Sequence, residues 1–411
     1  MAKSIYICYF GVRQPLVQTQ VVPYLLELRK DGVEIVLLTF EPDLRKQWTA
    51  EQVTEMKREM AEKGIEWHCL AYHKKLSVLA TSYDILAGAM FIRRMINAGD
   101  IDILHGRVHV PTLMGAIARK LSRRKPKLLF DIRGFFPEEY TDAGIWPENG
   151  LLYRSAKRVE KWLMKEADGF VVLTEKAREI LFPESLESGN DKLGRPVEVI
   201  PCCVDLKRFA AVKGDRQSVR AELGIEGRKV YTYVGSFGGW YLTDEMIDLF
   251  AAARERDPNS FTLILTQRDK EKISNLLTER GFSANDFFVG SVKPSEIARY
   301  LDASDVAVSF IKACYSKQSS SPTKIAEYLA CGLPVISNRG IGDLDELIED
   351  NKVGVMVDDF SRDSYLQAIS GIHKLGDVRE LCRQTVAREF DLEDVGGKRY
   401  RAIYEKLLLK A

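Results

Sequence analysis

The chain has 411 residues, with 60 basic and 59 acidic side chains and a formal net charge of +1, so its overall charge gives no indication of a nucleic-acid partner. The length allows two domains of ordinary size, and 45% apolar with 29% charged residues is typical of a globular protein. No apolar run approaches the ~18–20 residues of a spanning helix, and the seven cysteines lack disulfide or zinc spacing, so we expect a cytoplasmic protein with reduced thiols and no metal.

Strands and helices are predicted to alternate from the start of the chain. Ile5–Phe10 reads as a buried strand. Gly11 opens a loop over Val12–Thr19, and a helix to about Asp31 and a second strand over Val33–Phe40 follow. This order is typical of a doubly wound parallel sheet, in which ligands bind beyond the carboxyl ends of the strands. Gly11 therefore lies where the backbone could approach a substrate, and a plain turn glycine is the alternative. Further strands are expected over Ile65–Ala71, Ile101–His105, Lys127–Ile132 and Gly169–Thr174.

Two of these strands lead into polar side chains. Arg107 and His109 follow one strand, and Asp131 with Arg133 stands at the end of the next. The arginine fork suits oxyanions and histidine titrates near neutral pH. We predict that Arg107, His109 and Asp131 bind a substrate or move a proton. The alternative is that the histidine is a packed side chain and that Asp131 pairs with Arg133.

Basic side chains are concentrated in two segments of the first half. Residues 119–127 hold six positive charges, and Tyr153–Lys165 is predicted to be a basic amphipathic helix. Such surfaces can contact anionic lipid, which makes peripheral membrane association one hypothesis. A solvated helix end is the alternative.

A domain boundary is predicted in residues 183–196, which are rich in glycine, proline, serine and charge. Val197–Pro201 is expected to be the strand that enters a second domain, and the α/β alternation then resumes. Strands are predicted over Lys229–Val234, Phe261–Thr266, Phe287–Gly290, Val306–Phe310 and Val353–Val357. Helices are predicted over Thr243–Arg256, Lys270–Arg280, Pro294–Leu301, Ser361–Lys374, Val378–Glu389 and Val395–Leu408.

The stretch Ser316–Ser337 is the most informative one. It reads as a serine-rich loop, a helix that Gly332 ends and a short buried strand. A helix N-terminus favours anions, whereas a cation there is misplaced for the helix dipole, so Lys324 indicates an anionic ligand such as a phosphate. Glu327, about one turn further, could accept from ribose hydroxyls. An ordinary amphipathic helix with solvated charges is the alternative.

Residues 321–336 read Ser-Pro-Thr-Lys-x-x-Glu-Tyr-Leu-Ala-x-Gly-x-Pro-Val-Ile. This resembles the donor-site signature of retaining GT-B glycosyltransferases of family 4. The resemblance implies two Rossmann-like α/β domains, each with a doubly wound parallel sheet, that face a central cleft. Residues 1–190 would bind the acceptor and residues 191–390 the donor, while a helix in 391–411 would pack back onto the first domain.

The resemblance also implies donor contacts, with two departures. Glu327 matches the ribose-binding glutamate of the family, but the first glutamate of its usual pair would fall at Ser319. Many members carry an arginine and a lysine against the diphosphate in the loop after Lys229–Val234, where this chain has Ser236 and no lysine follows. We therefore expect Lys324 to carry more of that charge. The expected donor-binding residues are Gly11, Gly235, Ser236, Arg268, Ser319, Thr323, Lys324 and Glu327.

The sequence thus predicts a retaining, metal-independent glycosyltransferase without a cofactor. It would move a sugar from a nucleotide-sugar to a glycan or a lipid-linked acceptor, as in bacterial surface polysaccharide synthesis, with Lys324 stabilising the leaving diphosphate. Two alternatives stay open: a sugar-nucleotide epimerase or hydrolase on the same fold, and a non-catalytic nucleotide-sugar-binding subunit.

Overall fold

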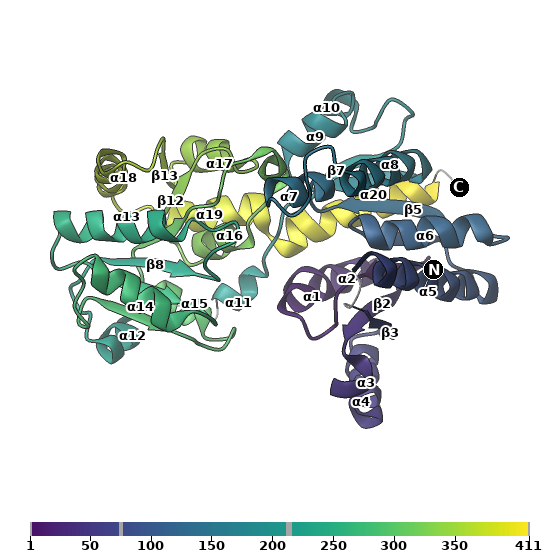
Figure 1. The fold of residues 1–411 in the computed structure, drawn as a ribbon, viewed down its shortest axis with the longest axis horizontal. Coiled ribbons are helices and arrows are strands. Elements are labelled where there is room, and N and C mark those ends of the chain that lie inside the picture. The colour runs from purple at the N-terminus through teal and green to yellow at the C-terminus, as the bar shows by residue number, and fades with distance from the viewer. Residues whose placement is uncertain (1, 74–76, 211–215, 410–411) are drawn as a thin grey trace. The chain divides into compact units, whose positions relative to one another are not determined.

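The computed structural model describes residues 2–73, 77–210 and 216–409. These residues form two compact units (Figure 1). The first consists of residues 1–201 and 392–411, and the second of residues 202–391. Each unit has one parallel sheet with helices packed against it, so the α/β class and the two doubly wound sheets predicted from the sequence are confirmed.

The sheet of the first unit has seven strands in the order β3-β2-β1-β4-β5-β6-β7, and every pairing is parallel. The direction of the strand order changes between β1 and β4, whose carboxyl ends therefore border the position where open α/β sheets bind ligands. The strands are β1 Lys3–Cys8, β2 Glu34–Pro42, β3 Ile65–Tyr72, β4 Ile103–Arg107, β5 Lys127–Ile132, β6 Gly169–Val172 and β7 Val197–Val199.

Helices cover this sheet, and most of their inward residues are apolar. They are α1 Pro15–Gln20, α2 Val22–Arg29, α3 Leu44–Gln47, α4 Ala50–Glu62, α5 Ser77–Ala98, α6 His109–Leu121, α7 Phe136–Asp142, α8 Leu151–Glu166, α9 Glu175–Leu181, α10 Ser185–Ser188 and α20 Lys398–Leu409, which the π-helix Leu392–Gly397 precedes. Helix α2 is the helix expected before Asp31, whereas α1 occupies the segment in which the sequence predicts a loop. Pro23 lies in the first turn of α2 and has no N–H to continue the hydrogen bonds of α1, so the chain breaks at Val21.

Strand β7 corrects the predicted boundary. The sequence predicts that Val197–Pro201 opens the second domain, but β7 pairs with β6 as the last strand of the first sheet, and the division falls after Pro201. Helix α20 also belongs to the first unit. Its residues Tyr400 and Tyr404 are buried there, and Arg401 pairs with Glu27 of α2 at 3.1 Å.

The sheet of the second unit has six parallel strands in the order β10-β9-β8-β11-β12-β13. Here the order changes direction between β8 and β11, which are paired through Val306 and Ala307. The strands are β8 Val230–Val234, β9 Phe261–Leu265, β10 Phe287–Gly290, β11 Val306–Ser309, β12 Val335–Asn338 and β13 Gly354–Val357.

Two apolar clusters, one on each face of this sheet, make the core of the second unit. Its helices are α11 Leu206–Ala210, α12 Arg216–Leu223, α13 Thr243–Arg256, α14 Lys270–Glu279, α15 Ile297–Asp302, the 3-10 helix η1 Tyr315–Ser319, α16 Thr323–Ala330, α17 Leu344–Asp350, α18 Arg362–Leu375 and α19 Arg379–Phe390. Helix α16 is the helix predicted inside the Ser316–Ser337 stretch. It ends as expected, with Gly332 at a φ of 75°.

Candidate functional site

The carboxyl ends of β8 and β11 carry the strongest candidate site. β8 leads into a glycine-rich loop that begins at Gly235, and β11 leads through η1 into α16. Because β8 and β11 flank the point where the strand order changes direction, a ligand of this unit is expected at their ends. Lys324, in the first turn of α16, lies against the end of β8.

The ammonium group of Lys324 is held by two tyrosine rings. Its Nζ donates to the hydroxyl of Tyr233 at 3.0 Å and lies 3.5 Å from the ring centroid of Tyr241 and 4.4 Å from that of Tyr233. Lys324 is only 9% exposed, and burial lowers the pKa of its amine to about 7 although the neighbouring Glu327 opposes the shift. A buried amine without a full counter-charge is a favourable partner for an entering anion.

The end of β8 is shaped around this amine. Gly235 has a φ of 144°, and a Cβ at this position would lie 3.0 Å from Lys324 Nζ and 3.2 Å from the Tyr233 hydroxyl, which itself donates to the carbonyl oxygen of Ser236. Tyr328 fixes α16 to the same strand, because its hydroxyl accepts from the backbone N–H of Val234 at 2.9 Å. The backbone conformation therefore favours glycine, and an added Cβ would be in tight contact with Lys324 Nζ.

Glu327 lies one turn further along α16. Burial raises the pKa of its carboxyl, and the cations of Arg208 and Lys324 reduce that shift without cancelling it. Its position on the same face as Lys324 is the one predicted from their spacing. The structure thus brings together Lys324, Glu327 and Gly235 of the predicted donor set.

The other predicted donor residues differ in exposure. Ser236 and Arg268 are exposed at the carboxyl ends of β8 and β9, and Thr323 opens α16. Ser319 is 2% exposed, and its hydroxyl donates to the carbonyl oxygen of Ser316 at 2.7 Å within η1. The side chain that replaces the usual glutamate therefore contributes to the turn that leads into α16.

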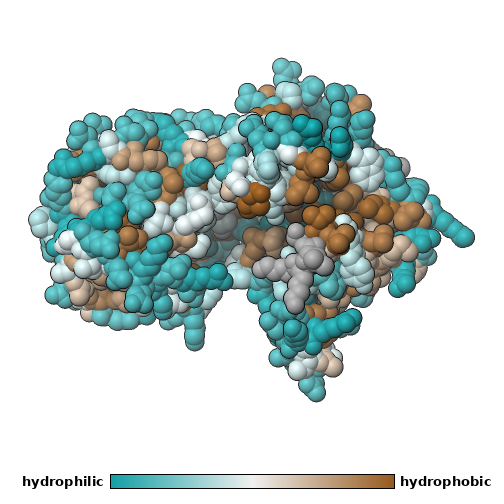
Figure 2. Space-filling view, viewed as in Figure 1, coloured by the Kyte–Doolittle hydropathy of each residue, from teal (hydrophilic) through white to brown (hydrophobic). Residues whose placement is uncertain are grey.

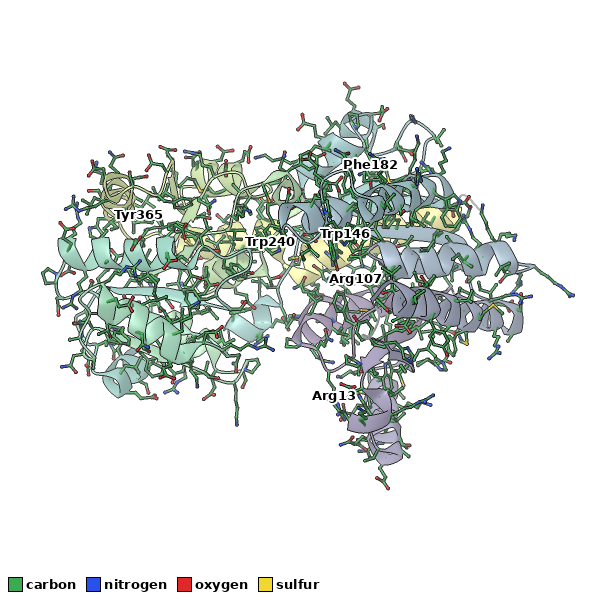
Figure 3. All side chains as sticks on the ribbon, in the orientation of Figure 1. Arg13, Arg107, Trp146, Phe182, Trp240 and Tyr365 are labelled. Atoms are coloured by element: carbon green, nitrogen blue, oxygen red, sulfur yellow. The ribbon has the colours of Figure 1, made fainter. Side chains whose placement is uncertain are left out.

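The sequence interpretation missed the aromatic residues of this site and a second lysine. Tyr241 and Trp240 follow the glycines of the β8 loop, and Trp240 is labelled in Figure 3. Lys317 of η1 is 6% exposed, with its Nζ 3.9 Å from the ring centroid of Trp240. The sequence signal was the Trp-Tyr pair directly after Gly-Gly, but only the fold shows that each ring of the pair contacts a lysine.

Gly11, in the first unit, lies after β1 as expected and is in close contact with the end of β2. A Cβ there would meet Glu41 Oε2 at 2.7 Å and Pro42 Cδ at 2.9 Å. Glu41 in turn accepts from the backbone N–H of Val12 at 2.8 Å and from the hydroxyl of Thr39. The glycine allows this loop to pack against the end of β2.

Arg107 and Asp131 belong to a buried polar network at the ends of β4 and β5. Asp131 Oδ2 accepts from the Tyr400 hydroxyl at 2.8 Å and lies 3.2 Å from Arg133 and 3.9 Å from Arg107. Burial raises the pKa of Asp131, but Arg133, His105 and Arg107 outweigh it and hold that pKa below its usual range. Arg107, labelled in Figure 3, is 4% exposed, and Asp131 is fully buried. Because Tyr400 belongs to α20, its hydrogen bond to Asp131 packs this helix onto the sheet.

His109 lies apart from that network. It is 4% exposed, its Nε2 lies 2.9 Å from Glu160 Oε2, and its ring packs between Phe130 and Phe136. Lys157 contacts the same glutamate and also lies 2.9 Å from Glu138. Arg107, His109 and Asp131 are therefore buried in two separate ion-pair clusters, which matches the alternative stated for the histidine and for Asp131.

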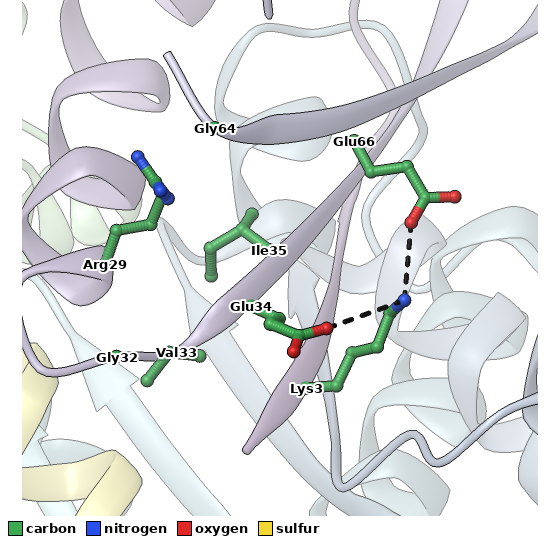
Figure 4. A pocket seen from close by; sticks show the side chains of 8 residues that line it. All are labelled: Lys3, Arg29, Gly32, Val33, Glu34, Ile35, Gly64 and Glu66. Carbon is green, nitrogen blue, oxygen red and sulfur yellow. Dashed lines mark hydrogen bonds and ion pairs between the residues drawn. The ribbon is translucent and has the colours of Figure 1, made fainter. Parts of the chain in front are cut away.

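A cavity of about 350 Å³ occurs at the opposite edge of the first sheet (Figure 4). It lies at the amino ends of β1, β2 and β3, and Lys3 crosses it to contact Glu34 and Glu66. Amino ends are not where parallel sheets bind their ligands, so this cavity is not the site. In the part of the chain that the structure describes, no group of three or more metal-ligating side chains converges, and no helix has the length and apolar run of a membrane span.

Two protein families match this chain, one in each unit. Residues 17–186 match the glycosyl transferase 4-like domain, and residues 215–388 match the glycosyl transferases group 1 family. Spore coat protein SA of Bacillus subtilis strain 168 is 28% identical over 209 residues, which are 46% of this chain and 52% of that protein. The alignment thus spans about half the length of this relative.

Solved structures share the whole fold at low identity. A glycosyltransferase from Rickettsia africae ESF-5 superposes with a TM-score of 0.69 at 17% identity, over 100% of both chains. Anabaena Alr3699/HepE in complex with UDP and glucose superposes with a TM-score of 0.68 at 14% identity, over 98% of this chain and 100% of that one. The chain, with its two parallel-sheet units, therefore has the GT-B fold.

Proposed function

We propose that this chain, a GT-B glycosyltransferase with a glycosyl transferase 4-like domain and a group 1 domain, transfers a sugar from a nucleotide-sugar donor to a glycan or a lipid-linked acceptor. The observation that carries the proposal is the amine of Lys324, buried between Tyr233 and Tyr241 at the ends of β8 and β11. An anion that enters there meets a cation already desolvated and held in place, which is the arrangement that stabilises a leaving diphosphate.

Each part of the donor has a proposed partner in the second unit. Lys324 and the backbone N–H groups at the start of α16 take the diphosphate, and Glu327 accepts from the ribose hydroxyls. Arg268, exposed at the end of β9, adds a second charge at the same edge of the sheet. UDP is a reasonable first nucleotide to test, since it is bound in the complex of Anabaena Alr3699/HepE.

We further propose that transfer proceeds with retention and without a metal ion. The resemblance of residues 321–336 to retaining enzymes supports retention, and the cation of Lys324 supplies charge that a metal ion would otherwise supply. Full activity in the presence of EDTA and an unchanged anomeric configuration in the product are the expected results.

A lipid-linked acceptor would lie at a membrane surface, and we propose that α8 contacts that surface. Its outward residues Arg154, Arg158, Lys161 and Lys165 are exposed, and no ion pair to them occurs among the described residues. Leu151, at the start of the same helix, is 82% exposed. Cations with an apolar residue at one end of the row suit an anionic lipid surface.

The donor site can be tested by thermal unfolding of the full-length protein with UDP-, GDP- and ADP-sugars, because a ligand that binds the native state raises Tm. We expect one donor to stabilise the wild type, and Lys324→Met to bind it at least about tenfold more weakly, since a charge-assisted hydrogen bond contributes about 1.5–3 kcal/mol. The matched control is Lys312→Met, which changes an exposed lysine of the same β11–α16 segment. Equal donor affinity in Lys324→Met and wild type would contradict the assignment.

Donor binding does not report on sugar transfer, so transfer is measured separately. Release of the nucleoside diphosphate with a series of p-nitrophenyl glycosides as acceptors should be abolished in Lys324→Met and retained in Lys312→Met. Donor binding without release on any acceptor would favour the non-catalytic binding subunit, and release in the absence of any acceptor would favour a hydrolase.

A further inference from the structure

A second polar cluster of the first unit lies outside the buried networks around Arg107 and His109. Tyr9 directly follows β1, His73 directly follows β3, and Asp84 comes from α5. The sequence gives no sign of it, because the three residues are far apart in the chain. They meet at the carboxyl edge of the sheet, where parallel sheets bind ligands.

Asp84 organises this cluster. It is fully buried and accepts three hydrogen bonds: one from the Tyr9 hydroxyl at 2.6 Å, one from the His73 backbone N–H at 3.0 Å and one from His73 Nδ1 at 2.6 Å. A carboxylate can only accept, so Nδ1 carries a proton and the histidine ring is fixed in one orientation. The His73 side chain is nevertheless 46% exposed, and Nε2 has no partner among the described residues.

One aromatic ring contacts the histidine ring, and a second group of aromatic side chains adjoins Tyr9. Tyr83 of α5 is 62% exposed and meets the ring edge-on, with centroids 5.2 Å apart. Tyr72 meets Tyr9 at 5.1 Å, and burial together with the Tyr72 hydroxyl raises the pKa of Tyr140 of α7. Tyr140 stacks on Trp146 at 4.4 Å. Figure 3 labels Trp146, and in Figure 2 apolar side chains gather on this face of the first unit.

We propose that this cluster is a carbohydrate-binding site, in which His73 Nε2 forms a hydrogen bond with a sugar hydroxyl and the exposed ring of Tyr83 packs against the sugar. The inference rests on the proposed function, since it gives a sugar-transferring protein a site for its acceptor. The chemistry is that of a saccharide: a pyranose has an apolar face of C–H groups that suits an aromatic ring, and hydroxyls that suit an oriented imidazole. Neutral His73 accepts from such a hydroxyl, and protonated His73 donates to it.

His68 provides a matched control on the same strand. It too is a histidine next to a carboxylate, with its Nε2 2.8 Å from Glu66, but it lies within β3 and its side chain is 28% exposed. His68→Gln therefore removes an equivalent pair without touching the proposed site. The chain has five histidines, so a protein with 13C-labelled histidine rings gives signals that single substitutions can assign.

The test titrates p-nitrophenyl glycosides of glucose, galactose, mannose and N-acetylglucosamine into the full-length labelled protein. We expect at least one glycoside to shift the His73 signal and not the His68 signal, and to bind about tenfold more weakly to His73→Gln and to Tyr83→Ala, as expected from loss of a hydrogen bond or a ring contact. His68→Gln should bind like the wild type, and Asp84→Asn should weaken binding while the folded protein keeps its other histidine signals.

The proposal is overturned if no glycoside of the series shifts the His73 signal, if His68 and His73 shift together, or if His73→Gln binds as tightly as the wild type. Thermal shifts by nucleotide-sugars, measured on the same samples, report on the donor site alone. Stabilisation by a nucleotide-sugar without a His73 response would reject this inference and leave the proposed function standing. A His73 response without stabilisation by any nucleotide-sugar would support this carbohydrate-binding site and reject the proposed function.

Discussion

Single residues decide the chemistry that each unit can perform, and Lys324 is the clearest case. Lysine is a strongly hydrated point charge, so its burial against two tyrosine rings brings the pKa of its amine to about 7. The charged and neutral forms are then both populated near neutral pH. A phosphate ligand favours the charged form, so donor binding and protonation are linked.

The pH dependence of UDP binding follows from this linkage. Below pH 7 the amine is already charged, and the affinity should be constant. Above pH 7 binding must first protonate it, so the affinity should fall by up to about tenfold per pH unit until the raised pKa of the complex is reached. Calorimetry in two buffers of different ionisation enthalpy should detect proton uptake between pH 7 and 9. Lys324→Met should show neither effect, and a flat profile in the wild type would contradict the charge assignment.

At the scale of elements, the loop after β8 and the helix α16 form one structure. Gly235→Ala would put a methyl group 3.0 Å from Lys324 Nζ at a φ of 144°. We expect a loss of about 1–3 kcal/mol in the free energy of unfolding and weaker UDP binding, because the amine must move.

Gly238→Ala is the control for that variant, because Gly238 lies in the same loop at a φ of 75° with no atom within 4 Å of the added Cβ. It should cost about 1–2 kcal/mol from its backbone alone and leave UDP affinity unchanged. Urea denaturation and calorimetry measure the two quantities. Equal UDP affinity in both variants would show that Gly235 does not shape the site.

Helix α20 depends in the same way on one hydrogen bond to a buried carboxylate. Tyr400→Phe removes the donor to Asp131, which then keeps two arginines and a histidine nearby but loses its 2.8 Å partner. We expect a loss of about 1–3 kcal/mol on urea unfolding. Tyr153→Phe removes a part-exposed contact with Glu138 at 3.2 Å and should cost much less. Similar losses in both variants would mean that the Asp131 network does not hold the helix.

At the scale of the whole molecule, charge is arranged locally. The chain carries a net charge of only +1, yet α8 exposes a row of four cations. Arg158→Gln with Lys161→Gln should weaken sedimentation with vesicles of phosphatidylcholine and 30% phosphatidylglycerol by roughly tenfold or more, at about 1 kcal/mol per charge. Lys270→Gln with Lys272→Gln, on α14, removes equal charge and should have little effect. Failure of the wild-type protein to sediment with these vesicles in 0.1 M salt would exclude the proposed membrane contact.

The sequence by itself determined the fold class and the principal donor residues, because both depend on local patterns. Apolar runs that alternate with amphipathic helices specify parallel sheets, and Lys324 and Glu327 stand out through their spacing from Pro322 and Gly332. Only the tertiary structure decided what these residues contact. Tyr241 reaches Lys324, and Asp84 reaches His73, across segments that no periodicity connects.

The same distinction explains where the sequence interpretation was incomplete. The sequence interpretation places strand β7 in the second domain, whereas the strand pairs with β6 of the first sheet. The residues of a strand do not by themselves determine which strand it pairs with. Arg107, His109 and Asp131 have the side chains of an active site, but burial and long-range partners tie them to α20 and α8. Residue type and spacing limit the chemistry that is available, whereas pairing, burial and exposure depend on contacts between distant parts of the chain.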